Sequence, residues 1–235
     1  MNILDPYGYM IPEIFNDGEV IPPPVIRDGS TVAWFLSDEL ATLTRDGANR
    51  VSRWNDYLGS GHDLIQANGA DQPLWSANGV LFDGVSEFMK TAPFAYVQPE
   101  MIYMVVKQVA WNLNGIFLDG NAAPVSALYQ NGITPEIRIN AGVIGPIDGS
   151  LAVDTWGIVR VLFNGAASTL QVNTNAQWIG NAGANDMGGF TLGLDGAAAF
   201  NNSNIQVKEI ILRNVADAAP AQTAIYAYLA AKYGI

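Results

Sequence analysis

The chain has 235 residues, of which 49% are hydrophobic and 14% are charged, so it is long enough for one large all-β domain or two small ones. Its net charge of −11 disfavours a nucleic-acid partner, because a grip on phosphate backbones needs clustered Lys and Arg. The absence of cysteine excludes disulfides, Cys-ligated metals and thiol chemistry.

The first 28 residues predict an extended, proline-punctuated arm, because prolines at positions 6, 12 and 22–24 resist helix formation. The segment lacks the basic and apolar regions of a signal peptide, and no later run is long enough to span a bilayer, so we expect no membrane insertion. The segment also contains large apolar side chains, which are unusual in a flexible tail. They predict an arm that docks on its own domain or on a neighbouring subunit, through Tyr7, Tyr9, Ile11, Ile14 and Phe15.

From Thr31 onward, short apolar segments alternate with Gly, Asn and Asp turns, a pattern typical of a β-sandwich or barrel. Ile137 and Ile139 should face inward with polar neighbours outward. Residues 101–106 are apolar on both faces, so the arm, a helix or a second subunit must cover the outer one. We expect strands within 31–36, 49–54, 79–84, 100–111, 115–120, 135–143, 155–165, 168–175, 188–194 and 205–214.

Residues 218–233 predict the one α-helix. Pro220 is tolerated in the first turn, and Gly234 marks the end. Ala221, Ile225 and Leu229 recur four residues apart, which predicts a face that packs on the sandwich.

The turn-rich stretch 51–75 reads best as a structural loop. Glycines at 59, 61 and 69 suit positive-φ turns, and Asp56 suits bonds to nearby amides above a buried Trp54. Neither the third glycine of a dinucleotide loop nor the Lys of a P-loop is present. His62 is the only histidine, which argues against zinc and leaves calcium open as an oxygen-ligated ion at Asp56, Asp63, Asp71 and Asp83.

Several separated motifs resemble bacterial and phage concanavalin A-like (laminin G-like) domains. They are Trp54 and Asp56, then Gly59 and Gly61, Gln66, Gln72 and Pro73, and finally Phe82, Asp83 and Gly84. The paired strands around 155–173 and the closing strand and helix resemble the same family. The resemblance implies a concanavalin A-like jelly roll of two antiparallel sheets over residues 29–235, with the C-terminal helix and the arm of residues 1–28.

No catalytic cluster is recognisable. Laminarinase-type relatives carry carboxylates spaced E-x-D-x-x-E on one strand, as retaining hydrolysis requires, whereas Asp38, Glu39 and Glu209 lack that spacing. A serine nucleophile would have only His62 as its base. We therefore expect a protein that is not an enzyme and has no cofactor.

Loop aromatics flanked by amides are the remaining candidates for chemistry, because an aromatic face stacks on a sugar while amides bond its hydroxyls. The alternative is that they are polar turns whose aromatics fold back onto the core or an interface. The candidates are Trp111, Asn112, Asn114, Trp178, Phe200 and Asn201.

Two functional hypotheses follow. The first is a virion structural or attachment protein, a phage tail, fibre or head-decoration component, joined through its arm to other virion proteins as a homo-oligomer, a trimer for example, and binding host glycans. The second is a free carbohydrate-binding module that is secreted or at the cell surface. The missing secretion signal favours the first.

Overall fold

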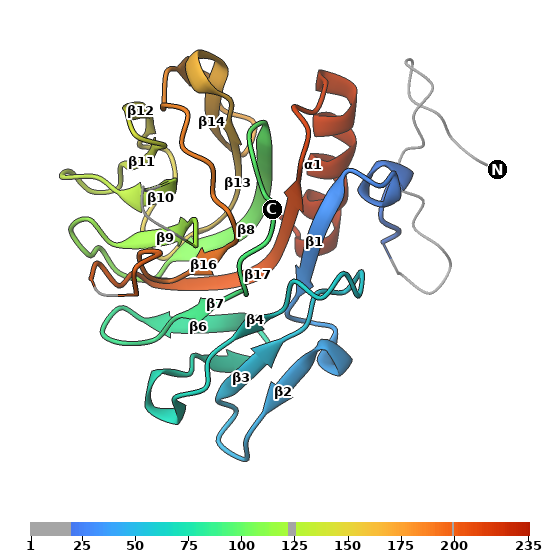
Figure 1. The fold of residues 1–235 in the computed structure, drawn as a ribbon, viewed down its shortest axis with the longest axis vertical. Coiled ribbons are helices and arrows are strands. Elements are labelled where there is room, and N and C mark those ends of the chain that lie inside the picture. The colour runs from blue at the N-terminus through green and yellow to red at the C-terminus, as the bar shows by residue number, and fades with distance from the viewer. Residues whose placement is uncertain (1–19, 122–125, 199) are drawn as a thin grey trace.

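The computed structural model describes residues 20–121, 126–198 and 200–235. These residues form two antiparallel β-sheets packed face to face and one α-helix, α1 (Ala219–Tyr233), as Figure 1 shows. The predicted all-β sandwich with a C-terminal helix is therefore confirmed. None of the helices in the described part of the chain is long and apolar enough to cross a membrane.

Sheet A contains eight strands in the described residues, and its centre is the pair of long strands β8 and β17. β1 pairs with the second half of β17, beyond the point where β6 ends, and so forms an edge. The order is β15 (Trp178–Gly180), β14 (Ser168–Val172), β13 (Trp156–Phe163), β8 (Glu100–Gln108), β17 (Asn204–Arg213), β6 (Gly79–Asp83) and β5 (Leu74–Ser76), with β1 (Thr31–Leu36) beside β17.

Sheet B contains nine strands in the same part of the chain, most of them shorter. Their order is β12 (Ile144–Asp148), β11 (Ile137–Asn140), β10 (Ala127–Gln130), β9 (Ile116–Asp119), β16 (Thr191–Leu192), β7 (Met89–Lys90), β4 (Leu64–Ile65), β3 (Val51–Trp54) and β2 (Leu43–Arg45). All ten segments predicted as strands contain one.

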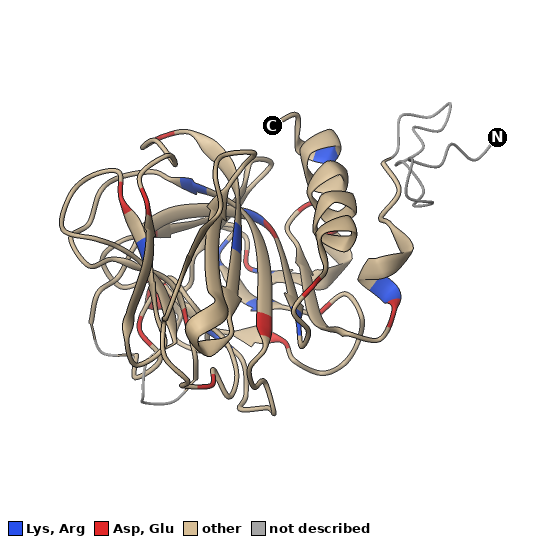
Figure 2. Ribbon diagram, turned by 90° about the horizontal axis from the view of Figure 1, so that it is seen from above, with Lys and Arg blue, Asp and Glu red and all other residues tan. Residues whose placement is uncertain are grey.

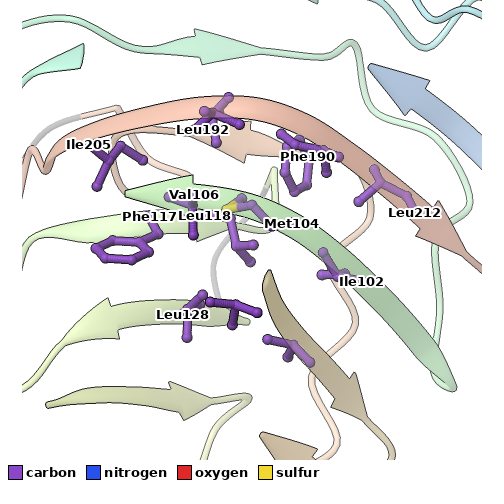
Figure 3. Packing of buried hydrophobic residues seen from close by; sticks show 14 of the residues in the cluster. Ile102, Met104, Val106, Phe117, Leu118, Leu128, Phe190, Leu192, Ile205 and Leu212 are labelled. Carbon is purple, nitrogen blue, oxygen red and sulfur yellow. The ribbon is translucent and has the colours of Figure 1, made fainter. Parts of the chain in front are cut away.

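The main core lies between the sheets. Ile102, Met104 and Val106 project from β8 toward Phe117 and Leu128 of sheet B, as Figure 3 shows, and all five are fully buried. Ile137 and Ile139 join this core, as their alternation with polar residues predicted.

A second core lies on the outer face of sheet A, and α1 covers it. Met101, Tyr103 and Val105 point to that face of β8 and pack under Ile225 and Leu229 of the helix. The prediction that residues 101–106 need cover on both faces is confirmed, and the helix supplies it. Gly234 ends the helix in a left-handed conformation, with its N–H bonded to the Ala230 carbonyl.

The described end of the predicted arm does not stay extended. Pro24 begins a short 3-10 helix, η1 (Pro24–Arg27), where its fixed φ is compatible with a first turn. Ile26 is fully buried in the core under α1, so these residues pack with the sandwich. The proposed docking residues Tyr7, Tyr9, Ile11, Ile14 and Phe15 lie outside the described residues.

The loop after β3 protects the exposed edge of β1. Asp56 accepts hydrogen bonds from the Trp34 amide (2.7 Å) and the Ser60 amide (2.8 Å), and the Tyr57 amide donates to the Trp34 carbonyl (2.8 Å). Trp54 is fully buried and donates its indole N–H to the Leu36 carbonyl. A strand edge paired in this way cannot add a strand from another chain.

Two glycines in that loop hold conformations that L residues resist. Gly59 has φ +71° and Gly61 has φ +86°, and a Cβ at either would meet no neighbour, so the cost of substitution is backbone strain alone. Gly69 was also expected to have a positive φ. Instead it starts a short 3-10 helix, and its φ is not positive.

Gly59→Val is therefore expected to lower the free energy of unfolding by about 1–2 kcal/mol, because a β-branched residue must enter the left-handed region. Gly69→Val is the matched control, a glycine just beyond β4, and should cost less, since its backbone is ordinary and its surroundings are open. Urea unfolding measures both. Equal losses for the two variants would show that the loop does not depend on positive φ.

Candidate functional site

A cavity of about 490 Å³ lies on the outer side of sheet A, between β1, α1 and the residues that lead into η1. Figure 2 shows η1 and α1 side by side on this flank of the molecule. We refer to this cavity as the helix pocket. Its walls are Val20, Ile21, Pro22, Arg27, Trp34, Leu36, Asp38, Glu39, Tyr57, Tyr228 and Lys232.

Tyr57 forms the exposed aromatic wall of the helix pocket. The Asp56 carboxylate and the Trp34 backbone hold its loop against β1, so the ring is placed by the same bonds that protect the strand edge. Its ring meets the indole of Trp34 edge to face, with centroids 5.0 Å apart. The side chain is 39% exposed, whereas Trp34 and Tyr228 are buried beneath it.

A buried carboxylate, Glu209 of β17, lies behind these aromatics. Its oxygens accept bonds from the Trp34 indole (2.7 Å), the Lys232 ammonium (2.9 Å) and the Tyr233 hydroxyl (2.8 Å), with Tyr228 at 3.4 Å. Burial raises the pKa of Glu209, and Lys232 opposes that shift. The cluster fixes α1 on sheet A and orients the pocket wall.

Charged groups surround the mouth of the pocket. Lys232 also pairs with the half-exposed carboxylate of Asp38 at 3.1 Å. The Arg27 guanidinium lies 5.5 Å from the Trp34 ring centroid and 5.6 Å from that of Tyr57. Glu39 accepts a bond from the Ala41 amide at 3.4 Å, which leaves acceptor capacity on its carboxylate.

The pocket therefore combines one exposed aromatic ring with carboxylate acceptors and cationic donors. This combination suits a small polyhydroxylated ligand, because hydroxyls both donate and accept while the ring packs on an apolar face. Its size falls within the usual range for small-molecule sites. Among the described residues, no group of three or more His, Cys, Asp or Glu is placed to hold a metal ion.

Five of the six residues predicted to bind a sugar come together at one end of the sandwich. The side chain of Asn112 donates to the Gly84 and Asn202 carbonyls, so the loop holding Trp111 and Asn114 touches the loop holding Phe200 and Asn201. These bonds use the donor hydrogens of Asn112 internally. Asn114 and Asn201 have φ of +63° and +67°. These left-handed conformations are typical of turns, which agrees with the alternative that the residues form polar turns.

Trp178 lies elsewhere. It sits on the edge strand β15, opposite Leu170 of β14, and is exposed beside Ile179. The order of strands in sheet A separates it from the loops that follow β8 and precede β17.

The F-D-G motif closes a loop. Asp83 accepts bonds from the amides of Val85, Ser86 and Glu87, and Gly84 has φ +74°. Phe82 is fully buried in the main core. Asp56 and Asp83, two of the possible calcium ligands, thus hold backbone amides in this structure.

No sequence pattern points to the helix pocket. Asp38, Glu39 and Glu209 were candidates only as a catalytic set, and their spacing does not fit one. No local sequence pattern marks the other pocket residues, because they come from three distant segments: Arg27, Tyr57 and Lys232. One usable sign was Glu209 itself, an acid inside an apolar strand, since buried acids are rare without partners.

No family model and no curated protein matches the sequence. Solved structures do match the fold. A sialidase from Trypanosoma rangeli is 17% identical with a TM-score of 0.63, and the match covers 99% of this chain and 36% of the sialidase. The chain thus spans about a third of that protein.

Two further structures extend this finding. Domain 4 of AbnA, a GH43 extracellular arabinanase from Geobacillus stearothermophilus in complex with arabinotriose, is 11% identical with a TM-score of 0.60, and the match covers 85% of this chain and 98% of that domain. A GH54 α-L-arabinofuranosidase is 13% identical with a TM-score of 0.56, covering 78% of this chain and 51% of the enzyme. The chain has a β-sandwich fold that carbohydrate-active enzymes also contain.

These neighbours correct the expectation that the protein is not an enzyme. They are a sialidase, an arabinanase domain and an arabinofuranosidase, so the fold occurs within enzymes that act on carbohydrates. The absence of an E-x-D-x-x-E cluster excluded only one kind of active site. The conclusion that the protein is not an enzyme did not follow from it and was wrong.

Proposed function

We propose that this chain is a carbohydrate-binding domain whose ligand occupies the helix pocket. The observation that carries the proposal is the pairing of a half-exposed Tyr57 with Asp38 and Glu39 at the mouth of one cavity. Tyr57 packs on the apolar face of a sugar ring, and the two carboxylates accept from its hydroxyls. Arg27 and Lys232 supply the opposing donors.

The fold supports this proposal. The arabinanase domain, almost all of which matches this chain, is bound to arabinotriose, and a sialidase neighbour is in complex with sialic acid. Arabino-oligosaccharides and sialic acid are therefore the first ligands to try. The virion role, the arm-mediated assembly and the homo-oligomer have no support from the comparisons and stay predictions from sequence, as does the alternative of a secreted or cell-surface module.

Isothermal titration of the full chain with arabinotriose and with free sialic acid tests the proposal. Binding of either sugar is expected, and Tyr57→Ala is expected to weaken it at least tenfold, about 1.4 kcal/mol, because the stacking surface is lost. Asp38→Asn should weaken it less, since an amide still accepts a hydrogen bond.

Trp178→Ala is the matched control, an exposed aromatic outside the helix pocket. It should leave the affinity unchanged. If Trp178→Ala or Phe200→Ala removes binding while Tyr57→Ala does not, the loop residues predicted from sequence form the site and the helix pocket does not.

A further inference from the structure

Five loops meet at the end of the sandwich where β8 finishes and β17 starts, and we refer to this end as the loop platform. It comprises residues 84–88, 109–115, 131–136, 149–155, 195–198 and 200–203. Figure 1 shows four of these loops, all but 149–155, along the left side of the molecule. The helix pocket is not part of the platform.

Three amide side chains tie the platform together. Gln108 donates to the Pro135 and Leu151 carbonyls, and Gln130 donates to Gln108 and to the Ala110 carbonyl. Asn112 bonds the Gly84 and Asn202 carbonyls while its own amide donates to Gln130. This connected network reaches all five loops, and a network of satisfied polar groups makes them rigid.

Each platform loop exposes one large apolar side chain to solvent. The most exposed is Val85 at 77% and the least is Val153 at 37%. The full set, one from each loop, is Val85, Leu113, Ile133, Val153 and Phe200. Four of the five are aliphatic, so they offer no ring for a sugar to stack on. Exposed apolar side chains gathered at one end of a domain mark a surface for contact with another protein or a membrane.

The platform carries acidic groups that are already engaged. Asp154 pairs with Lys107 at 2.9 Å, and Glu87 pairs with Arg50 at 3.4 Å. Asp83 and Asp195 accept backbone amides of their own loops, and Glu136 accepts from the Asn131 side chain. The five loops contain no Lys or Arg. With a net charge of −11 on the chain, electrostatic attraction to an anionic surface is excluded.

We propose that the loop platform docks on the surface of a lipid bilayer with zwitterionic headgroups. The apolar tips enter the boundary of the acyl chains, and the half-buried Trp111 with its neighbouring asparagines lies at headgroup level, the depth that tryptophan prefers. The contact is peripheral. It is independent of the sugar site, because no residue of the helix pocket belongs to the platform.

Flotation of the full chain with phosphatidylcholine vesicles tests the proposal. We expect the chain to float with these vesicles, with no gain from added phosphatidylserine and little loss in 0.5 M salt, because no counterions are released. The double variant Leu113→Ser/Phe200→Ser should reduce vesicle partitioning at least tenfold. Both side chains are exposed, so the fold does not depend on them.

Ile179→Ser is the matched control, an exposed apolar residue at an edge strand away from the platform. It should partition like the unmodified chain. Absence of flotation, or equal loss in the control, overturns the proposal. A change in sedimentation of the lipid-free chain on Leu113→Ser/Phe200→Ser would also overturn it, by assigning the platform to contacts between copies. Loss of arabinotriose binding in the Leu113→Ser/Phe200→Ser variant would overturn the proposal too, by assigning the loop platform to glycan binding.

Discussion

Replacing Glu100 by Gln is expected to raise the free energy of unfolding at pH 9 by up to about 5 kcal/mol and to change it little at pH 5. Glu100 begins β8 and is fully buried. One oxygen accepts the Met187 amide at 2.7 Å, and the other has no hydrogen-bond partner. Burial, aided by the charge of Asp186, raises the pKa of Glu100 to about 8.

The direction of this stability change follows from the raised pKa of Glu100. The folded protein holds the Glu100 proton more tightly than the unfolded chain, whose ordinary value is 4.5. The contribution of Glu100 to stability is therefore complete below pH 4.5 and is lost as the pH rises toward about 8. Glutamine cannot ionise, so the variant escapes that loss.

Urea unfolding at pH 5, 7 and 9 measures the effect. The dependence of the unfolding free energy on pH should become weaker in Glu100→Gln but should not vanish. Burial also raises the pKa of Glu87 to about 7 and raises the pKa of Glu209. Glu136→Gln, on a half-exposed loop, is the control and should keep the slope of the unmodified chain. An unchanged slope in Glu100→Gln would show that this carboxyl is not the buried acid described here.

Arg213→Met is expected to lower the free energy of unfolding by about 3–5 kcal/mol, because it leaves a buried carboxylate without its partner. The Arg213 side chain is 1% exposed and pairs with Asp217 at 2.7 Å and Asp28 at 3.1 Å. It also donates to the Val25 carbonyl and to the Thr31 hydroxyl. It thus joins β17, the turn before α1 and the segment that carries Arg27 to the helix pocket.

Arg53→Met provides the comparison. Arg53 also pairs with an aspartate, Asp63, but its side chain is 49% exposed, and exposed pairs contribute about 0–1 kcal/mol. Chemical unfolding of both variants at pH 7 separates the two cases. Similar losses for Arg53→Met and Arg213→Met would mean that burial does not set the importance of the Arg213 pair.

The fold was predictable where the sequence pattern is long. Residues 101–106, apolar on both faces, correctly required a sheet covered on both sides, and the spacing of Ala221, Ile225 and Leu229 correctly placed a helix on it. The short strands β4 and β7 have two residues each, too few for an alternating pattern to be visible. Tertiary pairing defines them.

The helix pocket was not predictable, because pocket residues far apart in sequence have no local pattern. Arg27, Tyr57 and Lys232 meet only after β1 pairs with β17 and α1 folds back over both. The clustering of Trp111 with Phe200 depends equally on strand order, since their loops flank the adjacent strands β8 and β17. Trp178 looked equivalent in sequence and lies apart for the same reason.

Amide chemical-shift mapping of the full chain during titration with arabinotriose or free sialic acid tests the central claim most directly. We expect concentration-dependent shifts confined to the amides around the helix pocket, those of Arg27, Glu39, Tyr57 and Lys232. The amides of Asn114 and Phe200 on the loop platform and of Ile179 on β15 should not move. Shifts confined to those three positions, or no shift with either sugar at millimolar concentration, would contradict it.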